Sequence, residues 1–522
     1  MAKTLIRKRE KTAPSHQPRT VRNVASNWGG YTFNVLITFF LSPYVVHRLG
    51  SSAYGVWILM VSLTGYLGLL DFGVRGAVTR YIAKFHEELE HEKASRIASS
   101  ALVIFAAAGI LAILSSLVLA KFFGHWFHVP EDYRESGRIV ILLAGVSVAV
   151  SLVGGVFGGI MAALQRFELL NAVEIVGTGL RALMIFFSLR AGRGLVALSI
   201  IQLSLSLATV TANAWIGLRL YPTLRIRLGK CERQYLNLIF SFSIYSFFLH
   251  VSTYVIFYTD SLVIGAFLSV SFITFFAIAG NLISYTRALV SGVTQTISPL
   301  ASRLEAQGNP RELQRVTHEY AGYVTMLILP IAVTFLLRGK SFIGLWMGPE
   351  FGDLSGRVLQ ILTLALIFIP GNGVAWAVMF GISKHKVPLP VSVGEGLCNL
   401  ALSCALARPM GIIGVAWATT LPSLASNLLF WPWYVRRTLG IPIRDYVFST
   451  WGLPVFAVLP FAFSTYLVER LWLTGSLFLF FTQVGLVLPV ALVGFWYSCI
   501  SRSQRRQYVQ SYVQPIVRAL VG

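Results

Sequence analysis

The sequence predicts an all-α polytopic membrane protein with about fourteen transmembrane helices. Of its 522 residues, 55% are hydrophobic and only 12% are charged, and the mean hydropathy is +0.69. This is too little charge for the surface of a soluble protein of this size. Apolar runs of about 18–25 residues recur along most of the chain, each long enough to cross about 30 Å of hydrocarbon. The runs are continuous and do not alternate with polar residues, which excludes a membrane β-barrel.

The N-terminal segment 1–23 is basic and has no apolar core. It is therefore predicted to be a cytoplasmic tail and not a cleavable signal peptide. Twelve predicted spans follow, at 24–47, 53–75, 95–121, 136–164, 169–189, 194–217, 238–267, 272–297, 318–337, 357–382, 388–407 and 411–434. Two more are predicted at 446–468 and 475–499.

The distribution of basic residues predicts the orientation. With a cytoplasmic N-terminus, 29 of the 43 lysines and arginines fall in inside segments, 11 in outside segments and three within spans. This bias follows the positive-inside rule and predicts that both termini are cytoplasmic, in a protein of the cytoplasmic membrane. The net charge of +22 then reports orientation and contact with anionic lipid, and does not indicate nucleic-acid binding.

The two halves of the chain resemble each other at a separation of about 217–220 residues. "MAALQRFELLNAV" (161–173) pairs with "MFGISKHKVPLPV" (379–391), since each ends a helix, makes a basic turn and starts the next helix. Two six-helix lobes are predicted, related by a pseudo-two-fold axis along the membrane normal, with a cavity between them. The lobes cover 24–217 and 238–434, the linker is 218–237, helices 446–499 lie outside the repeat, and the C-terminal cytoplasmic tail is 500–522.

Three arginines lie within predicted spans, where a charge at the bilayer centre costs about 2.5–3.5 kcal/mol on insertion scales. Arg75, near the cytoplasmic end of its span, can pair with Asp71 one turn earlier. Arg287 lies about 22 Å into the membrane with no acid within four residues, so we expect it to meet water or an anionic ligand. Arg181 is about 10 Å from Glu174; it is either a ligand contact or part of a helix–helix ion pair.

Three acids also lie within spans: Glu174, Asp260 and Glu395. A carboxyl group in a medium of low dielectric holds a proton more readily, so each is a candidate for coupling to H⁺ or Na⁺. The alternative is a neutral carboxylic acid hydrogen-bonded between helices.

Enzymatic and metal sites are not predicted. His125 and His128 in "HWFH" lack carboxylate or cysteine support, and the four cysteines have no metal spacing. Walker A, HExxH and GxSxG motifs are absent, so no cofactor is expected. The longest predicted outside loop, 338–356, has too few acids for the chemistry of a membrane polymerase or ligase.

The chain resembles the polysaccharide flippase (Wzx-like) family of the multidrug/oligosaccharidyl-lipid/polysaccharide superfamily. The resemblance spans about residues 20–500 and rests on the order and spacing of several stretches together. These are "NWGGYTFNVLITFFLSPYVVHRLGSSAYGVW", "GYLGLLDFGVRGAVTRYIAKF", "LQRF", "TDSLVIGAF" and "GIIGVAWATTL".

The resemblance implies transport of a polyprenyl-pyrophosphate-linked oligosaccharide from the cytoplasmic to the outer face of the membrane. It implies a cationic cavity between the lobes, for which Arg287, Arg181 and Arg75 are the candidate contacts in this sequence. A polysaccharide polymerase and a chain-length regulator are implied partners, with membrane lipids. The alternatives are a cation-coupled drug exporter of the related MATE group, for which an acidic cavity would be expected, and a lipid II-type flippase.

Overall fold

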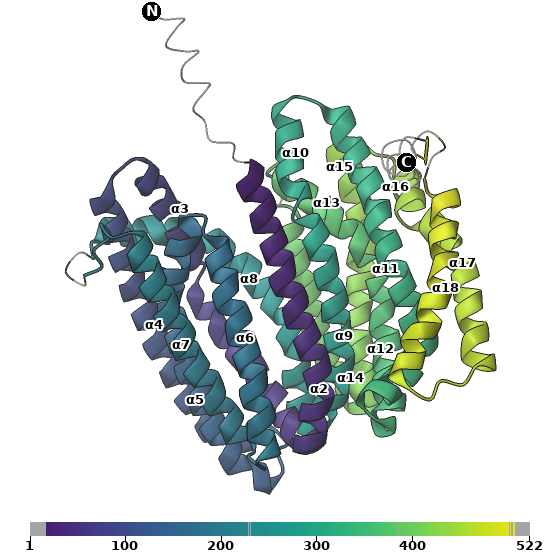
Figure 1. The fold of residues 1–522 in the computed structure, drawn as a ribbon, viewed down its shortest axis with the longest axis horizontal. Coiled ribbons are helices and arrows are strands. Elements are labelled where there is room, and N and C mark those ends of the chain that lie inside the picture. The colour runs from purple at the N-terminus through teal and green to yellow at the C-terminus, as the bar shows by residue number, and fades with distance from the viewer. Residues whose placement is uncertain are drawn as a thin grey trace, which may run out of the picture. The chain divides into compact units, whose positions relative to one another are not determined.

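The computed structural model describes residues 17–227, 229, 231–384, 386–500, 502, 505 and 506, and the regular secondary structure among these residues is helical, without strands. The predicted basic tails thus lie largely outside the described residues. The chain divides into two compact units (Figure 1). Unit 1 comprises Met1–Arg48, Leu67–Phe122 and Glu135–Phe247, and unit 2 comprises Leu49–Tyr66, Phe123–Arg134 and Phe248–Gly522. The all-α class is confirmed, whereas the lobe limits 24–217 and 238–434 stay predictions.

The first half of the chain contains α2 (Gln17–Leu67), η1 (Gly68–Asp71), α3 (Val74–Glu87), α4 (His91–Trp126), α5 (Glu131–Ala163), α6 (Phe167–Arg190), α7 (Leu195–Leu220) and α8 (Arg233–Phe267). Of these helices, α2, α4, α5 and α8 cross the sequence boundaries of the units. The second part of α2 and the end of α8 belong to unit 2.

The remaining helices all belong to unit 2. They are α9 (Val270–Thr294), α10 (Ile297–Ala306), α11 (Pro310–Met347), α12 (Pro349–Leu366), α13 (Ile369–Gly381), α14 (Pro388–Ala425), η3 (Ser426–Phe430), α15 (Trp431–Leu439), α16 (Ile443–Val447), η4 (Phe448–Gly452), α17 (Leu453–Leu471) and α18 (Leu477–Ser498).

Two of the long helices are broken at glycines. Gly50 in α2 has φ 78° and Gly411 in α14 has φ 61°, a backbone region that glycine enters without steric cost. Each break falls where two predicted spans meet. Within the described residues ten helices are long and apolar enough to cross a membrane, or eleven with the bent pair α12–α13. A broken helix counts once in that number, so the count of fourteen stays a prediction.

The stretch 67–81 is not the straight end of a span, as the prediction of a continuous helix over 53–75 required. Helix α2 ends at Leu67, and Phe72 and Gly73 both adopt positive φ before α3 begins. The Asp71 carboxylate accepts a hydrogen bond from the Arg75 backbone N–H at 3.3 Å. It therefore satisfies a donor in the first turn of α3, the role that acidic residues favour at helix starts.

The predicted outside loop 338–356 is also mostly helical, because α11 continues to Met347 and α12 begins at Pro349. Only Gly348, with φ 118°, interrupts the two helices. Arg338, which had been placed in that loop, lies inside α11 and is 1% exposed.

In unit 2 the second part of α2 packs directly against α9. A Cβ atom on Gly55 would come within 1.9 Å of the Val270 carbonyl oxygen, so only glycine permits this approach. The Thr274 hydroxyl donates to the Ser51 carbonyl at 2.6 Å. The next turns of α2 are thereby held beside α9, where they form one wall of a cavity.

Candidate functional site

A cavity of about 400 Å³ lies within unit 2. Its walls come from the second part of α2, the end of α8, and α9, α12 and α14. Its lining combines apolar side chains with polar and charged ones, as is usual for ligand sites. The polar and charged lining residues are Ser62, Tyr258, Asp260, Ser261, Asn281, Ser284, Arg287, Thr419 and Thr420.

One face of α9 supplies the cation. Asn281, Ser284 and Arg287 all line the cavity, and their spacing of three residues puts them on the same side of the helix. Two neutral hydrogen-bonding groups therefore precede the guanidinium along the cavity wall. This arrangement offers both a charge and adaptable polar contacts to an anionic, hydroxyl-rich ligand.

The Asp260 carboxylate at the end of α8 is 5% exposed and is held by side chains of α14. The Thr419 hydroxyl donates to Oδ2 at 2.8 Å, and the Ser403 hydroxyl approaches Oδ1 at 3.5 Å. Asn399 Nδ2 donates in turn to the Thr419 hydroxyl at 2.9 Å. Asp260 is thus fixed in orientation by a short polar network beside the cavity.

Arg287 has acidic neighbours that the sequence did not reveal. The carboxylates of Glu395 and Asp260 both interact electrostatically with its guanidinium, Glu395 more strongly. Although no acid lies within four residues of Arg287 along the chain, the guanidinium is not isolated from negative charge, and its role as a ligand contact stays a prediction. The two acids come from α14 and α8, so their position relative to Arg287 depends on how the helices pack. Three of the six predicted site residues are thereby brought together in unit 2.

Arg181 and Glu174 lie on α6 in unit 1. Arg181 Nε is buried without a hydrogen-bond partner in the part of the chain that the structure describes, and so are Thr178 Oγ1 of the same helix and Asn213 Oδ1 of α7. Glu174 is exposed, and among the described residues no ion pair joins it to Arg181. Buried polar atoms normally have partners, so each of these atoms has a hydrogen bond left to make with a ligand or water.

Arg75, also in unit 1, pairs with Asp71 as expected, with 3.6 Å between Nε and Oδ2. The side chain of Arg75 is 56% exposed and that of Asp71 is 23% exposed. Gly155 of α5 lies beside it, since a Cβ atom there would come within 3.3 Å of Arg75 Nε. Arg75 is therefore a partly neutralised surface cation at the start of α3.

Within the described residues, no group of three or more His, Cys, Asp or Glu side chains could hold a metal ion. One oxygen-rich polar set surrounds Asp260. It combines a carboxylate with the hydroxyls of Thr419 and Ser403 and the carboxamide of Asn399. Such hard oxygen donors suit a proton or a small hard cation.

Sequence reasoning missed Thr419, Asn399 and Ser403 as partners of Asp260. A signal existed for two of them, because Glu395, Asn399 and Ser403 follow one another at four-residue spacing and so share a face of α14. No comparable signal pointed to Thr419, which lies beyond the break at Gly411.

Comparisons with known proteins agree with this architecture. The putative O-antigen transporter of Shigella flexneri is 19% identical over 425 residues, covering 80% of this chain and 98% of that protein. The probable low-salt glycan biosynthesis flippase Agl15 of Haloferax volcanii is 25% identical over 415 residues, covering 78% of this chain and 80% of that protein. The fold is similar to that of the lipid II flippase MurJ in its inward closed conformation. The TM-score is 0.72 at 14% identity, and 91% of this chain and 98% of that chain are covered.

The family model described as "Polysaccharide biosynthesis protein" matches residues 45–355, which is more than half of the chain. The match includes the second part of α2, the end of α8 and the whole of α9. These elements supply Ser62, Asp260 and Arg287 of the cavity. The chain therefore belongs to the polysaccharide biosynthesis protein family, which confirms the resemblance seen in its sequence.

Proposed function

We propose that this protein is a flippase that moves a polyprenyl-pyrophosphate-linked oligosaccharide from the cytoplasmic to the outer face of the cytoplasmic membrane. The observation that carries the proposal is Arg287 on the wall of a cavity inside a membrane protein. An arginine presents a planar fork of donors that matches phosphate oxygens two at a time. The names of the relatives, O-antigen transporter and glycan flippase, support the same class of substrate.

In this proposal the pyrophosphate and the first sugar enter the cavity while the polyprenyl chain stays in the lipid. Arg287 binds the pyrophosphate, and Asn281 and Ser284 hydrogen-bond to sugar hydroxyls. The step is transport by alternating access of two lobes, with no bond made or broken. Both termini are cytoplasmic, and a polysaccharide polymerase and a chain-length regulator act beside the protein.

Arg181 and Arg75 are proposed as further anion contacts in unit 1. The case for Arg181 is its buried Nε without a hydrogen-bond partner among the described residues, because an anionic oxygen would satisfy that donor. Asp71 partly offsets the charge of Arg75, which therefore attracts an anion less strongly than Arg181 does. We propose that Arg75 meets the headgroup first, at the cytoplasmic mouth.

The acids are proposed to couple transport to an ion. Asp260 and Glu395 act on Arg287 and so oppose the binding of an anion there. When a proton or Na⁺ neutralises them, the positive potential at Arg287 rises and the pyrophosphate binds more tightly. Release of the ion would then weaken binding and favour discharge of the substrate. Glu174 is a third candidate, in unit 1.

The test is deletion of the gene in the source organism, followed by measurement of the lipid-linked oligosaccharide on each face of the membrane. We expect complete units to accumulate on the cytoplasmic face, with rescue by wild type and by the control Arg303→Gln, an exposed arginine of α10. Arg287→Ala should not rescue at equal protein level, and Arg287→Lys should rescue in part.

Two outcomes would count against the flippase. Normal oligosaccharide sidedness in the deletion strain would contradict it directly. Normal sidedness together with a new sensitivity to cationic drugs would favour the exporter of the MATE group, with Asp260 and Glu395 as its cation contacts.

A further inference from the structure

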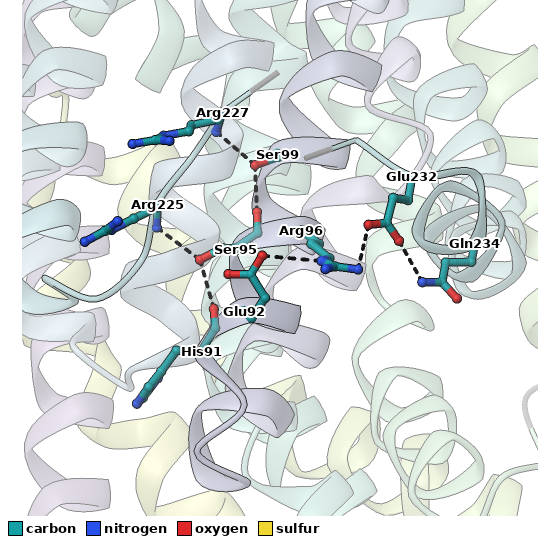
Figure 2. A network of polar contacts seen from close by, with 9 residues as sticks. All are labelled: His91, Glu92, Ser95, Arg96, Ser99, Arg225, Arg227, Glu232 and Gln234. Carbon is teal, nitrogen blue, oxygen red and sulfur yellow. Dashed lines mark hydrogen bonds and ion pairs between the residues drawn. The ribbon is translucent and has the colours of Figure 1, made fainter. Parts of the chain in front are cut away.

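The segment between α7 and α8 is fixed to the start of α4 by a ladder of serines, all within unit 1 (Figure 2). The backbone N–H groups of Arg225 and Arg227 donate to the hydroxyls of Ser95 and Ser99 at 3.0 and 3.1 Å. The two hydroxyls donate in turn to the carbonyls of His91 and Ser95 at 2.9 and 2.7 Å. The segment is therefore held to α4 at two points one helical turn apart.

This attachment sets the direction of the side chains. Leu224 is 5% exposed, and Ile226 packs against the same apolar core of unit 1. Arg225 and Arg227 are exposed, and in Figure 2 their guanidinium groups extend to the same side, away from Arg96. The alternation is that of an extended segment, in which residues two apart lie about 7 Å from each other. Two cations are therefore presented as a pair.

The two acids near this segment, Glu92 and Glu232, form ion pairs with Arg96. Arg96 contacts Glu232 at 2.6 Å and Glu92 at 3.5 Å, and Gln234 Nε2 also donates to Glu232 at 2.8 Å. No side-chain hydrogen bond or ion pair joins Arg225 or Arg227 to any residue that the structure describes. Their charges are thus not offset by the nearby carboxylates.

Arg225 and Arg227 lie beside the part of α4 where a membrane interface is expected. Helix α4 reads "HEKASRIASS" up to Ser100 and is apolar from Ala101 through "ALVIFAAAGILAIL". Because Arg227 is bonded to Ser99, it lies at the point where the polar part of the helix gives way to the apolar part. Just before the segment, the Arg219 guanidinium lies 4.0 Å above the ring of Trp215, a pairing of residue types typical of the headgroup region.

We propose that Arg225 and Arg227 form a binding site for the phosphate groups of anionic phospholipids in the cytoplasmic leaflet. The serine ladder holds the two guanidinium groups at headgroup level and directs them toward the lipid. The surface position of the pair favours bulk phospholipid over the transported substrate. The site does not depend on which molecule the protein transports.

The purified full-length protein is tested by native mass spectrometry in mixed micelles of phosphatidylglycerol and phosphatidylcholine. Wild type should retain phosphatidylglycerol preferentially. The double variant R225Q/R227Q should weaken that binding by about 30-fold, since each interfacial arginine contributes about fivefold. Both side chains are exposed, so the fold should be unaffected, which a melting curve checks.

Two further variants separate a site from net charge. S95A/S99A keeps every charge but releases the segment, and we expect it to lose most of the preference for phosphatidylglycerol. R303Q/R311Q removes two exposed charges of unit 2 and should behave like wild type. Unchanged binding in R225Q/R227Q would overturn the proposal. An equal loss in R303Q/R311Q, or wild-type binding in S95A/S99A, would overturn it as well.

Discussion

Two arginines of unit 2 show what the sequence alone does not distinguish. Arg338 of α11 is 1% exposed, and its guanidinium contacts Glu469, Thr474 and Gln483 at 2.6, 2.9 and 2.5 Å. It also lies 4.5 Å from the centre of the Phe480 ring. Arg287 of α9 instead lines a cavity of about 400 Å³. One arginine is enclosed by protein groups and the other faces a space.

The difference separates the structural role of Arg338 from the binding role that we propose for Arg287. The partners of Arg338 come from α17 and α18 and the turn between them, so the contacts fasten this helical hairpin to α11, beside which it lies in Figure 1. Arg287 has carboxylates nearby but also has room for a ligand. Depth in the membrane is therefore not a sufficient criterion for a functional arginine; open space beside the guanidinium is needed too.

The largest effect is expected at Arg338. Arg338→Met should lower the free energy of unfolding by about 3–5 kcal/mol, because it leaves a largely buried carboxylate of Glu469 without its cation. Thermal unfolding in detergent measures this. The double variant R338M/E469M should recover much of the loss, since apolar groups often replace a buried ion pair at little cost.

Arg357 provides the matched control for Arg338. It pairs with Asp353 at 3.0 Å, and both side chains are more than half exposed, so Arg357→Ala should change stability by less than about 1 kcal/mol. Equal losses in Arg338→Met and Arg357→Ala would show that the hairpin does not depend on the buried arginine.

The next effect is expected at Arg287 and should appear in transport, not in stability. Arg287→Ala should cost about 1.5–3 kcal/mol of substrate binding, the usual contribution of hydrogen bonds to charged groups, or about 10–100-fold in transport at low substrate. Its melting temperature should fall less than that of Arg338→Met. A variant that unfolds as readily as Arg338→Met would place Arg287 with the structural arginines.

A smaller change, of opposite sign, is expected at Asp260. Asp260→Asn keeps the size of the side chain but removes a negative charge that acts on Arg287. Binding of a pyrophosphate-bearing headgroup should tighten severalfold, because a negative charge that repels the anion is removed from the wall of the same cavity. Transport should no longer respond to a proton or Na⁺ gradient. Retained gradient dependence in Asp260→Asn would remove this residue from the coupling step.

The smallest effect is expected at the partly exposed ion pair between Asp71 of η1 and Arg75 of α3. Asp71→Asn should alter stability by less than about 1 kcal/mol, because exposed ion pairs contribute little, and it keeps an acceptor for the Arg75 N–H. Denaturant unfolding monitored by circular dichroism measures this change. A loss comparable to that of Arg338→Met would mean that the break after α2 depends on the Asp71 charge.

The helical fold could be predicted because hydropathy reports local free energies of burial in lipid, which act on each segment separately. The helix breaks at Gly50 and Gly411 coincide with predicted span limits, because each break lies in a short, less apolar stretch between two apolar runs. The extension of α11 through Arg338 could not be predicted, since the partners that make its burial possible lie more than a hundred residues further along the chain.

The site was predicted in part. Arg287 and Asp260 were recognised from their rarity in apolar segments, and they do share a cavity. Their relation to each other and to Glu395 was not predictable, because it depends on how α8, α9 and α14 pack. Thr419 was missed because threonine is common in apolar helices and carries no local signal of a buried partner.

The central claim is tested most directly by transport of a polyprenyl-pyrophosphate-linked oligosaccharide into proteoliposomes that contain only this protein. Each variant is normalised to the amount of folded protein. The account predicts transport by wild type, reduced transport by Arg287→Lys and almost none by Arg287→Ala, with Arg303→Gln equal to wild type. Wild-type rates in Arg287→Ala would contradict the claim that this cavity binds the pyrophosphate.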